Sequence, residues 1–223
     1  MSRRFDDITV WAFDLDNTLY PADCNLFDQV GALMGDFIAE LLGVTPTEAT
    51  KVQKDMFVSY GTTLRGLMEY HHVEPAEFLN YVHNVDMSPI PANPRLGRAI
   101  TALPGKKYVF TNADRSYAER VLTRLEIETV FDGIFDIEDA NYHPKPRDIA
   151  YDNFLARFDV DPARAVMIED MAKNLSPAHA RGMGTVWLPT GTPWSSADAD
   201  HDHIDHVVDD LTDWVENIAG LSD

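Results

Sequence analysis

The chain has 223 residues, 45% of them hydrophobic, so it is long and apolar enough to bury a substantial core, which argues against disorder. Its 37 acidic and 18 basic residues give a formal net charge of -19, which excludes a nucleic acid polymer as partner and favours a small substrate. The single cysteine, Cys24, excludes an intramolecular disulfide, and no apolar stretch reaches the length of a membrane span, so we expect a cytoplasmic protein that does not use a membrane.

The first predicted element is a short hydrophobic strand over residues 9–13, followed directly by Asp14 and Asp16. Residues two apart in an extended chain point to the same side. Two adjacent anions at the end of a buried strand are costly unless a cation or a proton relieves them. The pair therefore indicates a site, although an isolated pair of aspartates caps a turn about as often.

A purely helical block follows this strand. Apolar residues recur at a spacing of three and four, Gly43 ends the first such run, and Pro46 stands at a first helical position. We expect helices over residues 27–42, 46–58, 63–70 and 75–82. The proline-rich run 88–94 is predicted to be a linker.

Beyond the linker, short apolar runs alternate with helical segments. The expected strands are 107–110, 133–135, 165–168, 185–188 and 206–208, and the expected helices are 116–125, 148–158 and 172–181. Such alternation indicates a parallel sheet flanked by helices, to which the first strand also belongs. We therefore predict an α/β fold with a Rossmann-like, doubly wound parallel sheet as core domain (residues 1–19 and 94–223), interrupted by an all-helical cap domain (residues 20–93).

Ligands of doubly wound sheets bind outside the carboxyl ends of the strands. The polar residues expected at those ends are Asp14, Asp16, Thr111, Asn112, Lys145, Glu169 and Asp170. Taken singly, Thr111 is an ordinary strand-end threonine and Lys145 a solvated lysine between two prolines. Together, four carboxylates, one cation and one hydroxyl on one rim indicate Mg2+ with a bound phosphate.

These segments resemble the four signature motifs of the haloacid dehalogenase (HAD) superfamily of aspartate-nucleophile phosphatases. The matching residues are Asp14-Leu15-Asp16-Asn17-Thr18, Thr111-Asn112-Ala113, Lys145, and Glu169-Asp170 with Asn174. The helical insertion is similar to the family's cap of the first (C1) type. The segments 14–21, 60–67 and 110–113 are similar to the pyrimidine 5'-nucleotidase-like branch.

The resemblance implies the catalytic roles. Asp14 would attack phosphorus and form an aspartyl-phosphate, and Asp16 would protonate the leaving oxygen and then activate water. Mg2+ would be held by Asp14, by the backbone carbonyl of Asp16 and by Asp170, with Glu169 assisting directly or through water.

The same resemblance implies the contacts around the phosphoryl group. Lys145 and Thr111 would bind its oxygens, with Leu15 and Asn112 as further substrate contacts. Two other residues, Thr18 and Asn174, would contact the residues that bind the metal and the substrate and hold them in place. Many relatives carry aspartate in place of Asn174.

In the cap, Arg65 lies between Gly61 and Gly66, and glycines permit the close approach of a ligand. A helix arginine is more often solvated or ion-paired, so substrate contact by Arg65 is the minority expectation. The tract 198–206, rich in histidine and aspartate, has no recognisable structural-zinc pattern and is predicted to be a solvated loop.

The predicted function is that of a Mg2+-dependent phosphomonoesterase acting through an aspartyl-phosphate, preferentially on a pyrimidine nucleoside 5'-monophosphate. Dehalogenation needs no acid at position 16. Phosphonate cleavage would need a cap lysine, and Lys51 and Lys54 are expected on the helix surface. The alternatives left open are a phosphatase or phosphomutase for a small sugar phosphate and a catalytically idle protein-binding module.

Overall fold

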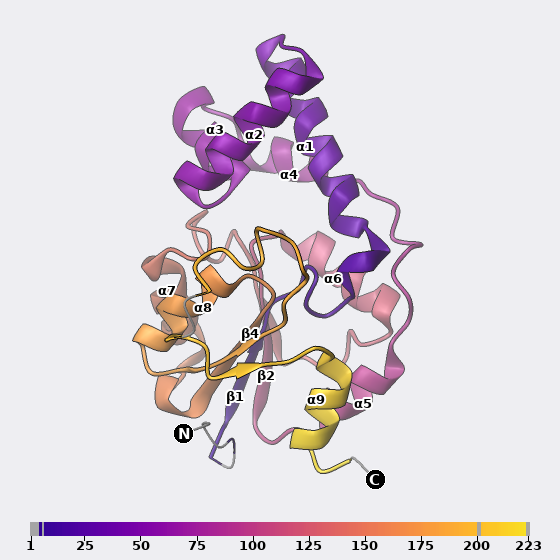
Figure 1. Ribbon diagram of the computed structural model, residues 1–223, viewed down its shortest axis with the longest axis vertical. Coiled ribbons are helices and arrows are strands. Elements are labelled where there is room, and N and C mark those ends of the chain that lie inside the picture. The colour runs from indigo at the N-terminus through magenta and orange to yellow at the C-terminus, as the bar shows by residue number, and fades with distance from the viewer. Residues whose placement is uncertain (1–4, 6, 200–201, 222–223) are drawn as a thin grey trace.

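The computed structural model describes residues 5, 7–199 and 202–221 (Figure 1). Its core is a parallel sheet with the strand order β3-β2-β1-β4-β5-β6. The strands are β1 (Val10–Phe13), β2 (Lys106–Phe110), β3 (Gly133–Phe135), β4 (Ala165–Glu169), β5 (Gly184–Trp187) and β6 (His206–Val207). Because the strand order reverses at β1, the carboxyl ends of β1 and β4 border the crevice in which such sheets bind ligands.

Alternating side chains of β1 cover the two faces of the sheet. Trp11 and Phe13 belong to one buried cluster, together with residues of helices α5 (Pro94–Ala102), α6 (Arg115–Leu125) and α9 (Leu211–Ile218). Val10 and Ala12 belong to a second cluster on the opposite face, with helices α7 (Asp148–Phe158) and α8 (Ala172–Ala180). The period of two along an extended strand thus supplies both layers with an apolar surface.

A layer of helices stands over the carboxyl ends of the strands (Figure 1). It comprises α1 (Leu26–Leu42), α2 (Pro46–Tyr60), α3 (Thr63–His71) and α4 (Pro75–Val82). Gly43 ends α1 in the left-handed conformation, at φ 65°, and the Thr45 side chain begins α2 by a capping box with Glu48. The exact division into a core domain and a cap domain at residues 19/20 and 93/94 stays a prediction.

The predicted fold class is confirmed, and most element boundaries agree within two residues. Helices α5 and α9 were not predicted. Helix α5 begins at Pro94, the last residue of the expected linker, because Asn93 accepts a hydrogen bond from the Leu96 N–H and Pro94 occupies the first helical position. Helix α9 is short, and Asp210 caps its first turn.

The histidine-rich tract is only partly the solvated loop that we expected. Residues 200 and 201 lie outside the described residues. His203 is buried and lies 2.9 Å from the carbonyl of Ala172 through Nε2, and Asp205 accepts a hydrogen bond from the Thr185 N–H at 3.0 Å. These contacts tie the segment to α8 and β5. Within the described part of the chain, no helix is both long and apolar enough to cross a membrane.

Candidate active site

Asp14 is fixed at the point where β1 ends. Its backbone N–H donates to the carbonyl of Ile168 on β4 at 2.9 Å, and its side chain is only 9% exposed. The carboxylate oxygen Oδ1 of Asp14 accepts a hydrogen bond from Lys145 Nζ at 2.7 Å. The other oxygen, Oδ2, accepts one from the Thr18 hydroxyl at 3.1 Å. The structure thus brings together Asp14, Thr18 and Lys145.

Lys145 is a completely buried cation, 1% exposed. Its ammonium group donates to Asp14 Oδ1, to Glu169 Oε1 at 3.0 Å and to the carbonyl of Phe110 at 2.8 Å, which uses all three protons. The Asn112 side chain fixes the backbone of Lys145, because it accepts a hydrogen bond from the Lys145 N–H and donates one to the Lys145 carbonyl. Burial alone lowers the pKa of Lys145, but Asp14 and Glu169 raise it to about 12.

Glu169 is the last residue of β4, and four donors surround it. Oε1 accepts from Lys145 and from the side-chain amide of Asn174, and Oε2 accepts from the backbone N–H groups of Asp170 at 2.8 Å and Met171 at 3.3 Å. Although burial raises the pKa of Glu169, Lys145 and these hydrogen bonds hold it below its ordinary value. A metal bound by Glu169 would share its oxygens with these donors.

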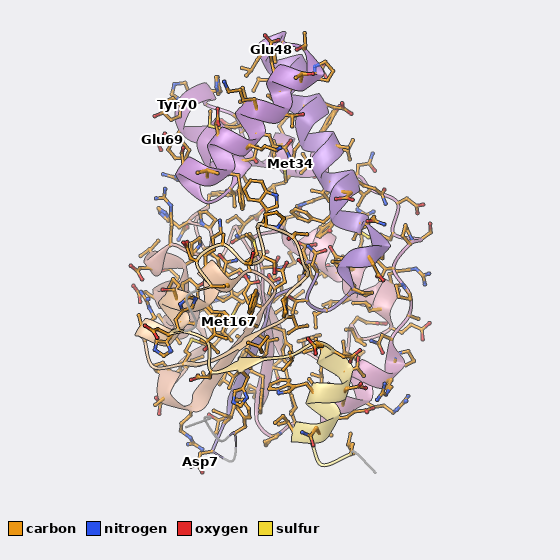
Figure 2. The ribbon with its side chains drawn as sticks, viewed as in Figure 1. Asp7, Met34, Glu48, Glu69, Tyr70 and Met167 are labelled. Carbon is orange, nitrogen blue, oxygen red and sulfur yellow. The ribbon has the colours of Figure 1, made fainter. Side chains whose placement is uncertain are left out.

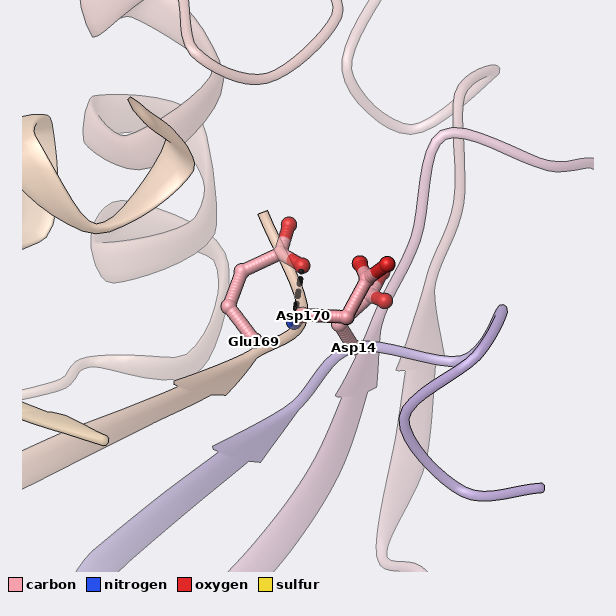
Figure 3. A group of neighbouring side chains, drawn as sticks. All are labelled: Asp14, Glu169 and Asp170. Carbon is pink, nitrogen blue, oxygen red and sulfur yellow. Dashed lines mark hydrogen bonds between the residues drawn. The ribbon is translucent and has the colours of Figure 1, made fainter. Parts of the chain in front are cut away.

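The carboxylates of Asp14, Glu169 and Asp170 offer ligand atoms within 4.8 Å of one another (Figure 3). Burial and the charge of Glu169 raise the pKa of Asp14 to about 8, and the same two causes raise that of Asp170 well above its ordinary value. Nearby, Asn174 Oδ1 is buried without a hydrogen-bond partner among the described residues. Crowded buried carboxylates with a spare amide oxygen fit a hard divalent cation and its bound water.

Asp16 lines the same cavity as Lys145 and is partly buried. Its Oδ1 accepts two phenol hydrogen bonds, from Tyr20 at 2.6 Å and from Tyr117 at 2.8 Å. Burial raises the pKa of Asp16 although both phenols lower it. The two tyrosines were missed from the sequence; for Tyr20 the available signal was its position one helical turn after Asp16.

Three predicted substrate contacts, Thr111, Leu15 and Arg65, do not line the cavity between the helical layer and the strand ends. Thr111 is buried, and its hydroxyl oxygen accepts from the Ala113 N–H at 3.0 Å, which leaves its own proton to donate. The Leu15 side chain is fully buried in the core. Arg65 pairs with Glu69 at 3.2 Å, and Glu69 lies on the outer side of α3 (Figure 2).

A cavity of about 450 Å³ lies between the helical layer and these strand ends. Its floor contains Asp14, Asp16, Asn112, Lys145, Glu169, Asp170 and Asn174. Its upper wall is largely apolar and includes Phe27, Val30, Met34, Phe57, Leu64, Phe78, Leu79 and Val82. Arg65 does not line the cavity, and its contact with a substrate stays a prediction. Lys54 is exposed, as expected, and also lines the cavity.

The haloacid dehalogenase-like hydrolase family matches residues 8–182. The chain belongs to this family. Phosphate metabolism protein 8 of Saccharomyces cerevisiae is 25% identical to this HAD hydrolase over 233 residues, which cover 94% of the chain and 65% of the yeast protein. The chain therefore spans less than two thirds of that relative's length.

Solved structures similar to this HAD hydrolase share its fold at low sequence identity. A HAD phosphatase from Thermococcus onnurineus has a TM-score of 0.64 at 17% identity, with 96% of this chain and 98% of that chain covered. YfnB from Bacillus subtilis, bound to magnesium, has a TM-score of 0.59 at 13% identity, with 97% and 99% covered. The L-2-haloacid dehalogenase from Xanthobacter autotrophicus with covalently bound chloropropionic acid has a TM-score of 0.59 at 14% identity, with 96% and 100% covered.

Proposed function

We propose that this HAD hydrolase is a Mg2+-dependent phosphomonoesterase that acts through an aspartyl-phosphate on Asp14. The observation that carries the proposal is the presence of two different carboxylates on the cavity floor: Asp14, bound to Lys145, and Asp16, held by two phenols. A nucleophile and a separate acid are the groups that hydrolysis of a phosphate ester requires. The similarity to Phosphate metabolism protein 8 of yeast and to the HAD phosphatase from Thermococcus onnurineus supports the same reaction class.

The proposed reaction has two steps, formation and hydrolysis of the aspartyl-phosphate. An oxygen of Asp14 attacks phosphorus while Asp16 gives its proton to the departing ester oxygen. Water then loses a proton to Asp16 and displaces Asp14 from phosphorus, which releases inorganic phosphate. Acid and base assistance of this kind is worth roughly 10²- to 10⁴-fold each.

The phosphoryl oxygens would be bound by cationic and neutral donors. In this proposal Lys145, which lines the cavity, and the Thr111 hydroxyl bind them, and Lys145 exchanges one of its present hydrogen bonds to do so. When bound at Asp14, Asp170 and the backbone carbonyl of Asp16, Mg2+ would neutralise charge between the attacking carboxylate and the phosphate dianion.

Dehalogenation is the competing reaction because several similar structures are dehalogenases. A halide leaves as an anion and takes no proton, so a dehalogenase has no use for an acid beside its nucleophile. In this chain Asp16 lines the cavity and is held in place by Tyr20 and Tyr117. That arrangement favours an alcohol as the leaving group.

We further propose a pyrimidine nucleoside 5'-monophosphate as the preferred substrate. A cavity of about 450 Å³ with a polar floor and an aromatic and aliphatic upper wall suits a phosphate that carries a flat, weakly polar group. A sugar phosphate would leave many hydroxyls against apolar side chains, which costs free energy.

The test is phosphate release from UMP, CMP, AMP, GMP, glucose 6-phosphate and p-nitrophenyl phosphate. We expect Mg2+-dependent release that EDTA and Asp14→Asn abolish, with UMP and CMP preferred. The matched control is Asp55→Asn, an exposed carboxylate on α2, which should behave as wild type. A flat substrate profile would refute the nucleotide preference, and no release by folded protein would favour a binding module.

A further inference from the structure

The carboxylate of Asp16 is held through only one of its two oxygens. Tyr20 and Tyr117 both donate to Oδ1, at 2.6 Å and 2.8 Å. The two tyrosines are each 1% exposed, so water does not compete for their hydroxyls. Two fixed donors on one oxygen set the rotation of the carboxylate, and the second oxygen, Oδ2, is the one left for a substrate.

We infer, resting on the proposed function, that Tyr20 and Tyr117 are positioning residues that fix Asp16 so that its Oδ2 carries the proton to and from the substrate. The arrangement serves both steps. When Asp16 is protonated on Oδ2, Oδ1 is a carbonyl oxygen and still accepts both phenol hydrogen bonds. When Oδ2 has given its proton to the leaving oxygen, the same two donors stabilise the carboxylate that must next take a proton from water.

The two phenols come from different parts of the chain, which makes the arrangement rigid. Tyr20 belongs to the turn that follows β1 and lies four residues after Asp16. Tyr117 lies in the first turn of α6, where Asp114 accepts a hydrogen bond from the Tyr117 N–H at 2.9 Å. The orientation of Asp16 therefore depends on where α6 holds Tyr117 relative to the turn that follows β1.

A further contact fixes the ring of Tyr117. The His83 imidazole, which lines the cavity, stacks on it with 4.2 Å between ring centroids and an interplanar angle of 25°. His83 Nδ1 is hydrogen-bonded to the second carboxylate oxygen of Asp114, and Arg120 donates to the His83 carbonyl at 2.8 Å. His83 directly follows α4, so the chain leaving the cap packs onto the residue that orients the acid.

The test uses leaving groups that differ in their need for an acid. p-Nitrophenolate departs without a proton, whereas the 5'-alkoxide of UMP needs one. We expect Tyr20→Phe and Tyr117→Phe each to slow the first turnover of UMP by ~10- to 100-fold, as for a misplaced catalytic group, with little change in KM. The first-turnover burst of p-nitrophenol should stay within about threefold of wild type, since that step needs no proton transfer.

Two controls separate positioning from damage to the fold. Tyr108→Phe removes a phenol oxygen from a buried ring on the opposite face of the sheet, stacked on Phe158 at 4.0 Å, and should leave both first turnovers unchanged. In an Asp16→Asn background, Tyr117→Phe should cause no further loss, because its effect acts through Asp16.

The outcomes are distinguishable. Equal losses for UMP and p-nitrophenyl phosphate, no loss in either, or an additive effect of Tyr117→Phe and Asp16→Asn would overturn the positioning role and leave the phosphatase intact. Absence of any phosphate release by the wild type would overturn the proposed function together with this inference.

Discussion

Replacement of Lys145 by methionine tests the electrostatic arrangement of the site directly. The variant keeps an unbranched side chain, one heavy atom shorter, but removes its charge and all three hydrogen-bond donors. Because the Lys145 side chain is only 1% exposed, solvent screens its ion pairs with Asp14 and Glu169 only weakly. Removing one partner from a buried ion pair costs about 3–5 kcal/mol, so we expect a loss of that size in the free energy of unfolding near neutral pH without metal.

The deficit should depend on pH in a defined direction. In the wild type the lowered pKa of Glu169 contributes stability that is present above its ordinary value of 4.5 and is lost as the pH falls through the lowered value. In Lys145→Met, Glu169 lacks its counter-charge and its pKa rises. The deficit should therefore shrink by roughly 1.4 kcal/mol for each pH unit as the pH falls toward 4.5, since a protonated Glu169 needs no cation.

Urea unfolding, followed by the fluorescence of the 4 tryptophans in EDTA, measures this loss. In thermal unfolding of a chain of this size, each kcal/mol lost lowers Tm by ~2–4 °C, so the Tm of Lys145→Met should lie roughly 6–20 °C below that of the wild type. The matched control is Lys106→Met, whose partner Asp132 lies at 2.6 Å but whose side chain is 64% exposed; it should cost only a small fraction of that loss. Equal, small losses in both variants, or a deficit that does not change with pH, would refute the reasoning.

Two further predictions concern the metal site and the contact between cap and core. Protons compete with Mg2+ for Asp14 below the pKa of this carboxyl, which is about 8, so Mg2+ should raise Tm more above pH 8 than below it. Mg2+ should not raise the Tm of Asp14→Asn. Differential scanning fluorimetry measures both, and a Tm shift independent of pH would contradict the prediction. Gly61 has φ 87°, and an added Cβ would lie 3.4 Å from Pro144 Cγ beside the Lys145 loop, so Gly61→Ala should lower stability by about 1–2 kcal/mol or more. The control Gly43→Ala has φ 65° and nothing within 4 Å, so a loss no larger at Gly61 than at Gly43 in urea unfolding would exclude the loop contact as a cause.

The strands and the residues at their ends were predictable because local patterns determine both. A run such as residues 165–168 reads as a buried strand from its own composition, and covalent continuity then places Glu169 and Asp170 at the carboxyl edge of the sheet. Helix α5 was missed because its capping residue, Asn93, stands in a proline-rich run that also suits a linker. The buried position of His203 was missed because a polar tract carries no signal of the carbonyl that it meets.

The order of hydrophobic runs and helical segments in the sequence was enough to predict an α/β fold with a helical insertion. It also predicted which carboxylates lie at the ends of β1 and β4. Only the tertiary structure decided which atoms meet. Lys145 reaches Asp14 across 131 positions of sequence, and Tyr117 reaches Asp16 across 101. Those pairings form because the strand order brings the segments that follow β2 and β3 to the carboxyl end of β1. Contacts between distant segments depend on the register of the assembled sheet and not on local periodicity.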